Sequence, residues 1–328
     1  AEPANAAGSD ANASAADDWL GSAPDFAAND IKETKQTDLL IIGAGNGGMA
    51  AAATAADLGI DFMLCEKSGS VQRTRHWFGA INTKYTEAAG VHVDEGRLLN
   101  EFSRYASGQC DQRVIRVWIK ESASVVDWID PILTQAGMTC AFDNDIDHET
   151  GGTSFALFPM EHYYSGKDAA GEALERNKVL LSYINDKGYD VTYNHKLIKL
   201  VQDDAGKVTG AIFETKDGMK QINAKNTLLA TGGYGNNLEM MEARQPWNQA
   251  LRIAAPGNAS SFNPTCTGDG IKAGLWAGAS KDKDAAPMVF DRGAVAPGVD
   301  AGYEGEGEGA MFRGSIFQEN IGSQPFMK

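Results

Sequence analysis

Residues 37–67 read TDLLIIGAGNGGMAAAATAADLGIDFMLCEK, in which an apolar run is followed by closely spaced glycines, an alanine-rich segment and a second apolar run. The run at 39–42 predicts a buried strand, and Gly43, Gly45 and Gly48 form a G-x-G-x-x-G turn directly after it. Glycines at this spacing let the backbone approach a pyrophosphate and let the next helix pack against the strand. The stretch therefore begins as a strand and a turn that can hold phosphate groups.

The second half of the stretch adds a helix, a strand and an acid. Residues 49–56 are good helix formers, and such a helix would point its N-terminal amides and its dipole at the phosphates. A strand at 62–64 leads to Glu66, about twenty residues past the turn, where a carboxylate can accept hydrogen bonds from ribose hydroxyls. These features predict an α/β, Rossmann-like dinucleotide-binding fold. The alternatives, a buried helix hairpin or a membrane span, are disfavoured because Asn46, Asp57 and Asp61 interrupt the roughly twenty apolar residues that a span requires.

The composition is that of an ordinary soluble globular protein. A length of 328 residues suggests two domains or one large one. Apolar residues make up 43% of the chain and charged residues 22%, as is typical of globular domains. The formal net charge of -15 argues against a nucleic-acid partner, because phosphate binding depends on concentrated Lys and Arg. A small-molecule ligand is therefore favoured.

Residues 1–37 are expected to form a disordered leader or linker. They are rich in Ala, Ser, Asn and Asp and cannot bury enough apolar surface to offset the entropy of ordering. The chain starts with Ala-Glu-Pro, a start that is typical after a secretory peptide has been cleaved behind small residues. We therefore expect an exported protein of the periplasm or cell envelope, with a trimmed chain as the alternative.

The cysteine pattern gives no indication of a metal site. Four cysteines are widely scattered and none forms a C-x-x-C pair, so the sequence predicts neither a metal cluster of the usual spacing nor a haem attachment. Cys65, at the end of the second strand, is expected to be buried and unreactive. An even number of cysteines permits a disulfide in an exported protein without selecting the pair.

A helical insert follows the dinucleotide unit. Residues 94–109 and 111–137 are interpreted as two helices, and apolar side chains of the second recur at spacings of three and four, so they are expected to face a core. These side chains are Val114, Val117, Trp118, Val125, Trp128 and Ile129. Another helix, at 171–187, ends at Gly188, a residue suited to a helix C-terminus.

From residue 190 the apolar period changes to two. Segments 190–202, 207–216 and 219–231 predict a small antiparallel β excursion, which ends in an apolar strand at 227–230. The glycines at 232 and 233 follow this strand at its C-terminal end, where an open α/β sheet places its ligand. A plain strand-to-loop turn is the alternative. Further on, Thr267 or Asp269 can cap a helix while nearby glycines bring the backbone close to a phosphate or ribitol chain.

Five motifs occur in a fixed order: GAGNGG at 43–48, EK at 66–67, TRHWFGAIN at 74–82, LLATGGYGNN at 228–237 and TGDGI at 267–271. In order and spacing they resemble the fumarate reductase and succinate dehydrogenase flavoprotein family, over residues 38–290. The resemblance implies FAD as the cofactor. It also implies an FAD-binding domain over 38–286 and the start of a capping, substrate-binding domain over 287–328.

The same resemblance implies a set of cofactor contacts. The pyrophosphate would lie at the glycine turn, the adenosine ribose at Glu66, and the adenine against the backbone of Leu197. Thr74 and its neighbours would pass beside the flavin, and Asp269 would lie near the ribose or ribitol. The full expected set is Gly43, Gly45, Asn46, Gly47, Gly48, Glu66, Lys67, Thr74, Gly79, Ala80, Leu197, Ala230, Thr231, Gly232, Gly233 and Asp269.

Two departures from the family pattern concern the flavin and the substrate. Members that attach FAD covalently use a His just before the Thr that aligns with Thr74; Arg73 stands there, so noncovalent FAD is expected. Met288 and Phe290 occupy the places of a Gln-x-His pair whose His binds a substrate carboxylate. A more apolar or aromatic substrate than fumarate is therefore favoured.

A third departure concerns the catalytic acid. The family's proton-donating Arg lies beyond the last residue of this chain, which we interpret as the N-terminal part of such an enzyme. Glu319 matches a Glu of the family's proton relay, although Gly322 replaces the relay's Arg. Glu319 is the expected catalytic residue, and a surface carboxylate is the alternative.

The chemistry implied by the resemblance is hydride transfer from the reduced flavin N5 to an activated carbon-carbon double bond, with a side chain supplying the proton. No haem or iron-sulfur motif occurs in the sequence, so electrons are expected from an external cytochrome or flavin protein. A complementing C-terminal polypeptide is a further expected partner. Alternatives are an oxidase or dehydrogenase of the aspartate or ketosteroid type, and a flavin-holding module without turnover. A nicotinamide-dependent enzyme is disfavoured because it leaves the β excursion and TGDGI unexplained.

Overall fold

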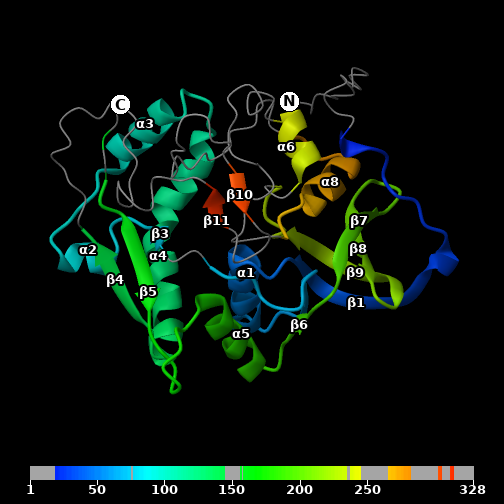
Figure 1. The fold of residues 1–328 in the computed structure, drawn as a ribbon, viewed down its shortest axis with the longest axis horizontal. Helices are drawn as coiled ribbons and strands as arrows, with labels where there is room; N and C mark the ends of the chain where they lie inside the picture. The colour runs from blue at the N-terminus through cyan, green and yellow to red at the C-terminus, as the bar shows by residue number, and fades with distance from the viewer. Residues whose placement is uncertain are drawn as a thin grey trace, which may run out of the picture. The chain divides into compact units, whose positions relative to one another are not determined.

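The computed structural model describes residues 19–74, 77–144, 156, 158–234, 237–244, 265–281, 302–304 and 311–313. The chain divides into two compact units (Figure 1). The first unit comprises Ala1–Gln72 and Asp190–Lys328, and the second comprises Arg73–Tyr189. The helical insert expected within the FAD-binding domain therefore forms a compact unit of its own.

The first unit is built on a six-stranded sheet with the order β6-β2-β1-β9-β8-β7. β1 is parallel to both of its neighbours, β2 and β9, while β7, β8 and β9 are antiparallel to one another. This arrangement confirms the predicted α/β fold with an antiparallel β excursion. The strands are β1 (Ile31–Ile42), β2 (Phe62–Cys65), β6 (Val191–Thr192), β7 (Lys196–Gln202), β8 (Val208–Thr215) and β9 (Gly218–Leu229).

The central strand β1 owes its position to the apolar run 39–42. Leu40 and Ile41 are fully buried, as expected for a strand covered on both faces. Ile42 pairs with Cys65 on one side and Leu229 on the other, so the C-terminal ends of three strands meet at one edge. Cys65 is fully buried, as predicted, and this burial raises the pKa of its thiol to about 12, which fits its expected lack of reactivity.

Residues 19–37, part of the expected disordered leader, are ordered. Residues 31–37 form the first half of β1 and pair with the first half of β9, where Glu33 Oε2 lies 2.8 Å from Lys220 Nζ. Trp19 is buried, and the backbone carbonyl of Gly21 accepts a hydrogen bond from Trp276 Nε1 at 3.1 Å. Residues 31–37 have no alternating apolar pattern that would predict a strand. They form one because their backbone pairs with β9, a strand far along the chain.

Helices flank the sheet of the first unit. α1 (Asn46–Asp57) places Met49, Ala52 and Ala53 against the strands, and all three are fully buried. α8 (Asp269–Trp276) packs beside β7 (Figure 1) and contributes Ala273 to a core with Leu40, Phe213 and Ile222. The remaining elements are a 3-10 turn (Ala28–Asp30), α6 (Leu238–Arg244) and the antiparallel pair β10 (Gly302–Glu304) and β11 (Met311–Arg313).

The second unit combines helices with a three-stranded antiparallel sheet of order β3-β5-β4. Asp94 and Asp111 cap α3 and α4, because their carboxylates accept hydrogen bonds from backbone amides of the first helical turns. The elements are β3 (Trp77–Gly79), α2 (Lys84–Ala88), α3 (Glu95–Tyr105), α4 (Gln112–Gln135), β4 (Thr139–Asp143), β5 (Glu161–Ser165) and α5 (Arg176–Asp186). None of the helices that the structure describes has the length and apolar content needed to cross a membrane.

The buried face of α4 agrees with the predicted one only in part: Trp118 packs against a core cluster, and Trp128 and Ile129 are half-buried. Val114, Val117 and Val125 are more than half exposed, at 67%, 61% and 53%. The helix instead buries Ile119, Ser122, Val126, Asp130, Ile132 and Leu133. Apolar residues lie on several sides of this helix, so a three-and-four spacing fits more than one stripe, and tertiary packing selects among them.

A buried carboxylate organises the second unit. Asp130 accepts hydrogen bonds from the Tyr85 hydroxyl, from the Tyr164 hydroxyl at 2.8 Å and from Lys84 Nζ at 2.5 Å. Burial alone would raise the pKa of Asp130, but these three hydrogen bonds outweigh it and hold the pKa below its usual range. Asp130 therefore remains ionised while it joins α4 to α2 and β5.

A buried histidine lies close to this cluster. The His162 ring is fully buried; its Nδ1 donates to the Met160 carbonyl at 3.0 Å, which leaves Nε2 to accept from the Thr83 hydroxyl at 2.9 Å. Burial lowers the pKa of His162, so the folded unit holds a neutral ring.

We expect the free energy of unfolding of the second unit to fall as the pH drops below about 6.5, the ordinary pKa of histidine. Below this pH the unfolded chain binds a proton at His162, whereas the buried ring of the folded unit stays neutral. The contribution is present above this pH and is lost as the pH falls toward the lowered folded pKa. Urea unfolding between about pH 7.5 and 5.5 would measure it. His162→Gln should flatten the dependence, and His92→Gln, on the surface of the same unit, should not. An unchanged slope in His162→Gln would contradict the assignment.

Candidate dinucleotide-binding site

Two glycines of the turn between β1 and α1 are required by packing. Gly43 has a φ of +104°, and a Cβ there would lie 2.4 Å from the Ala230 carbonyl oxygen. A Cβ at Gly48 would lie 1.7 Å from the Gly43 carbonyl oxygen. The absence of side chains at Gly43 and Gly48 lets the backbone after β9 and the start of α1 pack directly against the turn. The sequence-predicted contact between helix and strand is therefore present.

Packing within the protein does not explain the glycine at position 45. It precedes α1 with an ordinary φ of -84°, and a Cβ there would meet no atom within 4 Å. Asn46 and Gly47, the next two residues, are exposed. The helix start carries no side-chain cap and no acidic residue in its first turn, so its dipole favours an anion. The open space at Gly45 is a cradle that a side chain would fill, and a pyrophosphate fits it.

Glu66 follows β2 and faces the glycine turn. Its side chain is buried, with Oε2 accepting from the Ala44 amide at 2.8 Å and Oε1 accepting from the Ser68 amide at 2.9 Å. The Ala44 amide belongs to the turn itself. The carboxylate therefore ties the turn to the end of the second strand.

The second glycine turn lies against the first. The Ala230 amide donates to the Ile42 carbonyl at 2.8 Å, and Gly232 adopts a φ of +70°. The Gly233 carbonyl accepts from the Gly268 amide at 3.1 Å, and a Cβ at Gly270 would lie 1.9 Å from Thr231 Oγ1. The start of α8 is thereby packed onto this turn, and the structure brings residues 43–48, 230–233 and 269 together.

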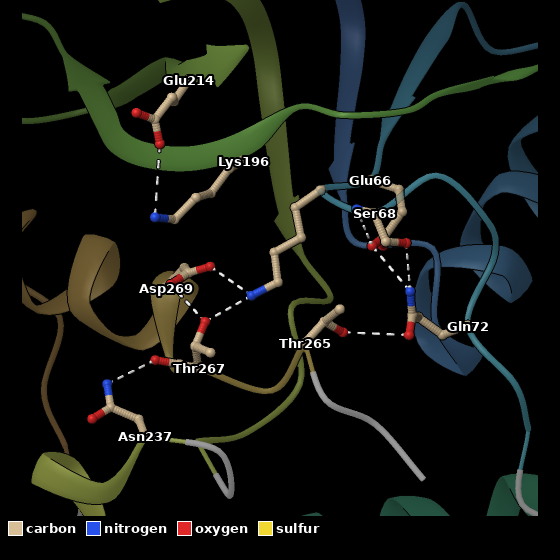
Figure 2. Close-up of polar contacts among 10 residues, drawn as sticks. Glu66, Ser68, Gln72, Lys196, Glu214, Asn237, Thr265, Thr267 and Asp269 are labelled. Carbon is tan, nitrogen blue, oxygen red and sulfur yellow. Dashed lines mark hydrogen bonds and ion pairs between the residues drawn. The ribbon is translucent and has the colours of Figure 1, made fainter. Parts of the chain in front are cut away.

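A polar network joins the end of β2 to the start of α8 (Figure 2). Lys67 Nζ donates to Thr267 Oγ1 at 2.7 Å and to Asp269 Oδ2 at 2.8 Å, while Thr267 Oγ1 donates to Asp269 Oδ1 at 2.9 Å. Asn237 Nδ2 donates a hydrogen bond to the Thr267 carbonyl at 3.0 Å. Lys67 and Asp269, two of the predicted cofactor residues, are thus direct partners.

This network borders a pocket of about 460 Å³, within the range of small-molecule sites. Three of its lining side chains are lysines and one is a carboxylate, so it suits a ligand with phosphate and hydroxyl groups. Lys196 also forms an ion pair with Glu214 of β8, with 3.7 Å between Lys196 Nζ and Glu214 Oε2 (Figure 2). The lining residues are Lys67, Ser68, Lys196, Asn237, Thr265, Thr267, Asp269 and Lys272.

Four other predicted cofactor residues take no part in the Lys67, Thr267 and Asp269 network. Leu197 is buried in β7, which forms one edge of the described sheet. Thr74, Gly79 and Ala80 belong to the second unit: the Thr74 amide donates to Glu175 Oε1 at 2.7 Å, and the Ala80 amide donates to the Met160 carbonyl at 2.9 Å.

Some of the predictions lie outside the described residues. These are the catalytic assignment of Glu319 and the substrate-side positions Met288 and Phe290; of the predicted capping domain, only β10 and β11 are described. Within the described part of the chain, no group of three or more His, Cys, Asp or Glu side chains is arranged to hold a metal ion, and all four cysteines are free thiols.

Sequence reasoning missed four polar residues of the first unit: Ser68, Gln72, Asn237 and Thr265. Gln72 Nε2 donates to Glu66 Oε1 at 3.1 Å, and Thr265 Oγ1 donates to Gln72 Oε1 at 3.3 Å (Figure 2). Asn237 ends the LLATGGYGNN motif, which offered a signal. Gln72 and Thr265 belong to no such pattern.

Comparison with known proteins places this geometry in a family. The FAD binding domain family matches residues 38–297. A probable fumarate reductase, Ifc3, of Shewanella frigidimarina is 27% identical over 75% of this chain and 40% of its own length. A vinyl phenol reductase of Lactiplantibacillus plantarum is 26% identical over 77% of this chain and 48% of its own.

A solved structure agrees with these relatives. The open conformation of a flavocytochrome c3 fumarate reductase superimposes with a TM-score of 0.59 and 26% identity, covering 76% of this chain and 42% of that one. The chain thus spans less than half the length of each of these proteins. Because the family match extends over most of the chain and contains the glycine turn, Glu66 and Asp269, the protein belongs to the FAD-binding family of oxidoreductases.

Proposed function

We propose that the whole protein is a flavin-dependent reductase that moves a hydride to an activated carbon-carbon double bond of a small organic acceptor. The observation that carries the proposal is the FAD-binding domain over residues 38–297. Two relatives support the acceptor class, because one is named for fumarate and the other for a vinyl phenol, and both compounds contain a carbon-carbon double bond. Met288 and Phe290 favour an acceptor other than fumarate.

The residues of the first unit fit FAD. The open backbone at Gly45 and the uncapped start of α1 would hold the pyrophosphate, and Glu66 would accept a ribose hydroxyl. When bound, FAD supplies hydride transfer at its flavin ring. The chain's own residues bind and orient: the lysines of the pocket offset phosphate charge, and Asp269 holds Lys67 in place.

Electrons would come from an external donor, a cytochrome or a flavin protein. A C-terminal polypeptide would supply the substrate-binding and proton-donating groups. Glu319 would relay the proton within such an assembly. These partners rest on the resemblance and on the share of the relatives that the chain spans.

The proposal predicts that alkenes reoxidise the flavin. The FAD-loaded protein, together with its C-terminal complement where that is a separate polypeptide, would be reduced with dithionite under argon. Fumarate, urocanate, acrylate and 4-vinylphenol would then be added in turn while the flavin absorbance is followed. Return of the oxidised spectrum with at least one alkene is expected. Reoxidation by oxygen alone would favour an oxidase and contradict the proposal.

FAD is expected to be held noncovalently, because Arg73 precedes Thr74 where covalent attachment would need a histidine. Precipitation of the loaded protein with acid should release the yellow chromophore into the supernatant. The Arg73→His variant, which introduces the missing histidine, provides a comparison for any flavin that stays in the precipitate. Flavin that stays with the wild-type precipitate after denaturation would contradict noncovalent binding.

A further inference from the structure

Most of the acceptor capacity of Glu66 is used within the protein. A carboxylate offers about four acceptor sites, two on each oxygen. Oε1 accepts from the Ser68 amide at 2.9 Å and from Gln72 Nε2 at 3.1 Å, which fills both of its sites. Oε2 accepts from the Ala44 amide at 2.8 Å. One site, on Oε2, is left for a ligand.

The orientation of the Gln72 amide is fixed by its neighbours. The Ser68 hydroxyl donates to the Ser70 carbonyl at 2.7 Å, so its oxygen is free to accept from Gln72 Nε2, also at 2.7 Å. On the opposite side, the Thr265 hydroxyl donates to Gln72 Oε1 at 3.3 Å. The amide nitrogen thus faces three acceptors, since the Ser70 carbonyl also lies 3.4 Å away, and the amide oxygen faces a donor. Figure 2 shows the contacts of Gln72 with Glu66, Ser68 and Thr265.

The backbone of Gln72 holds the loop in addition to its side chain. Its amide donates to the Ala44 carbonyl at 3.1 Å, within the glycine turn. Ala44 therefore receives one hydrogen bond from the Gln72 backbone and gives one to Glu66. Removing only the side-chain amide would leave this anchor in place and open one acceptor site on Glu66 Oε1, which the Ser68 amide would still hold.

We propose that Gln72 is a positioning residue for the dinucleotide, which holds the Glu66 carboxylate so that a single acceptor site on Oε2 meets a single ribose hydroxyl. The proposal rests on the assignment of the glycine turn and Glu66 to FAD. Without the Gln72 amide, the carboxylate would have one open acceptor site on each oxygen and would accept either of the two vicinal ribose hydroxyls. Gln72 therefore sets the selectivity between these hydroxyls, and Thr265 holds Gln72 from the far side.

The test uses ADP, 2'-deoxy-ADP and 3'-deoxy-ADP as displacers of FAD, followed by flavin fluorescence, so it needs no turnover. For the wild type, the analogue lacking one hydroxyl should displace FAD about tenfold less well than ADP, and the analogue lacking the other at most about twofold less well. A tenfold loss is that expected for one lost hydrogen bond. The ratio of the two losses measures the selectivity between the hydroxyls. Gln72→Met, of similar length without the amide, should reduce this ratio to at most about threefold. Gln36→Met, at an exposed position on β1 of the same unit, is the matched control and should preserve it.

Three outcomes would overturn the proposal. Equal losses for both deoxy analogues in the wild type would show two ribose contacts. A Gln72→Met variant that weakens all three displacers alike, with an unchanged ratio, would show a purely structural role. In a Glu66→Gln background, Gln72→Met should change FAD affinity at most about twofold, and a larger change would show that Gln72 acts through another group. Failure of the wild type to bind FAD or ADP would instead remove the site assignment itself.

Discussion

Gly45→Ala is expected to abolish tight FAD binding while the protein still folds. The residue has an ordinary φ of -84°, and an added Cβ meets no protein atom within 4 Å, so the substitution introduces neither strain nor a clash. The same Cβ would occupy the space through which a pyrophosphate approaches the start of α1. We expect the dissociation constant for FAD to rise at least about a hundredfold, equivalent to about 3 kcal/mol. Flavin fluorescence titration measures it, and thermal unfolding followed by circular dichroism checks the fold.

Gly69→Ala is the matched control for this variant. Gly69 is an exposed glycine of the first unit, at which a Cβ likewise meets no atom within 4 Å. It should leave both FAD affinity and melting temperature unchanged. Gly48→Ala should behave differently from both, because its Cβ would lie 1.7 Å from a backbone oxygen and would destabilise the fold itself. Retained FAD affinity in a folded Gly45→Ala protein would contradict the assignment of the turn.

Asp130→Ala is expected to lower the free energy of unfolding of the second unit by about 3 kcal/mol, because removing one partner of a buried charged network leaves the others unsatisfied. The buried Tyr164 hydroxyl loses its acceptor, and so does the half-buried Tyr85. Lys84 is 46% exposed and can be solvated by water, so its loss of the carboxylate adds little to the destabilisation. Urea unfolding, monitored by hydrogen exchange at the α4 amides, measures the loss.

Two further variants separate charge from hydrogen bonding. Asp130→Asn keeps an acceptor for the tyrosines and should lose less than Asp130→Ala. Asp127→Ala, at an exposed position of the same helix, should change stability by no more than about 0.5 kcal/mol. Because the folded pKa of Asp130 is lowered, its contribution is present above about pH 4 and is lost as the pH falls further. Equal stability of Asp130→Ala and Asp127→Ala would contradict the account.

The parts of the site that the sequence predicted are those encoded locally. The glycine turn, the strand before it and Glu66 lie within thirty residues, and each follows from a backbone requirement at its own position. The antiparallel group at β7, β8 and β9 was predicted for the same reason, because alternation and turn residues are local signals.

The parts that the sequence did not predict depend on distant contacts. Gln72 meets Thr265 through a fold that brings residues 193 positions apart together, and neither belongs to a periodic pattern. The polar residues 31–37 become a strand only because β9 pairs with them. The buried face of α4 could not be selected from its sequence, since Val114 and Ile119 both fit helical spacings while only Ile119 is buried.

The most direct test of the central claim is a titration of the nucleotide-free protein with FAD, ADP and NAD, followed by flavin and tryptophan fluorescence. The account predicts that FAD binds at one site per chain and that ADP displaces it, because the glycine turn and Glu66 bind the adenosine diphosphate half. NAD shares this half but lacks the flavin, so it should bind more weakly than FAD. Preferential binding of NAD, or FAD binding that saturating ADP leaves untouched, would contradict it.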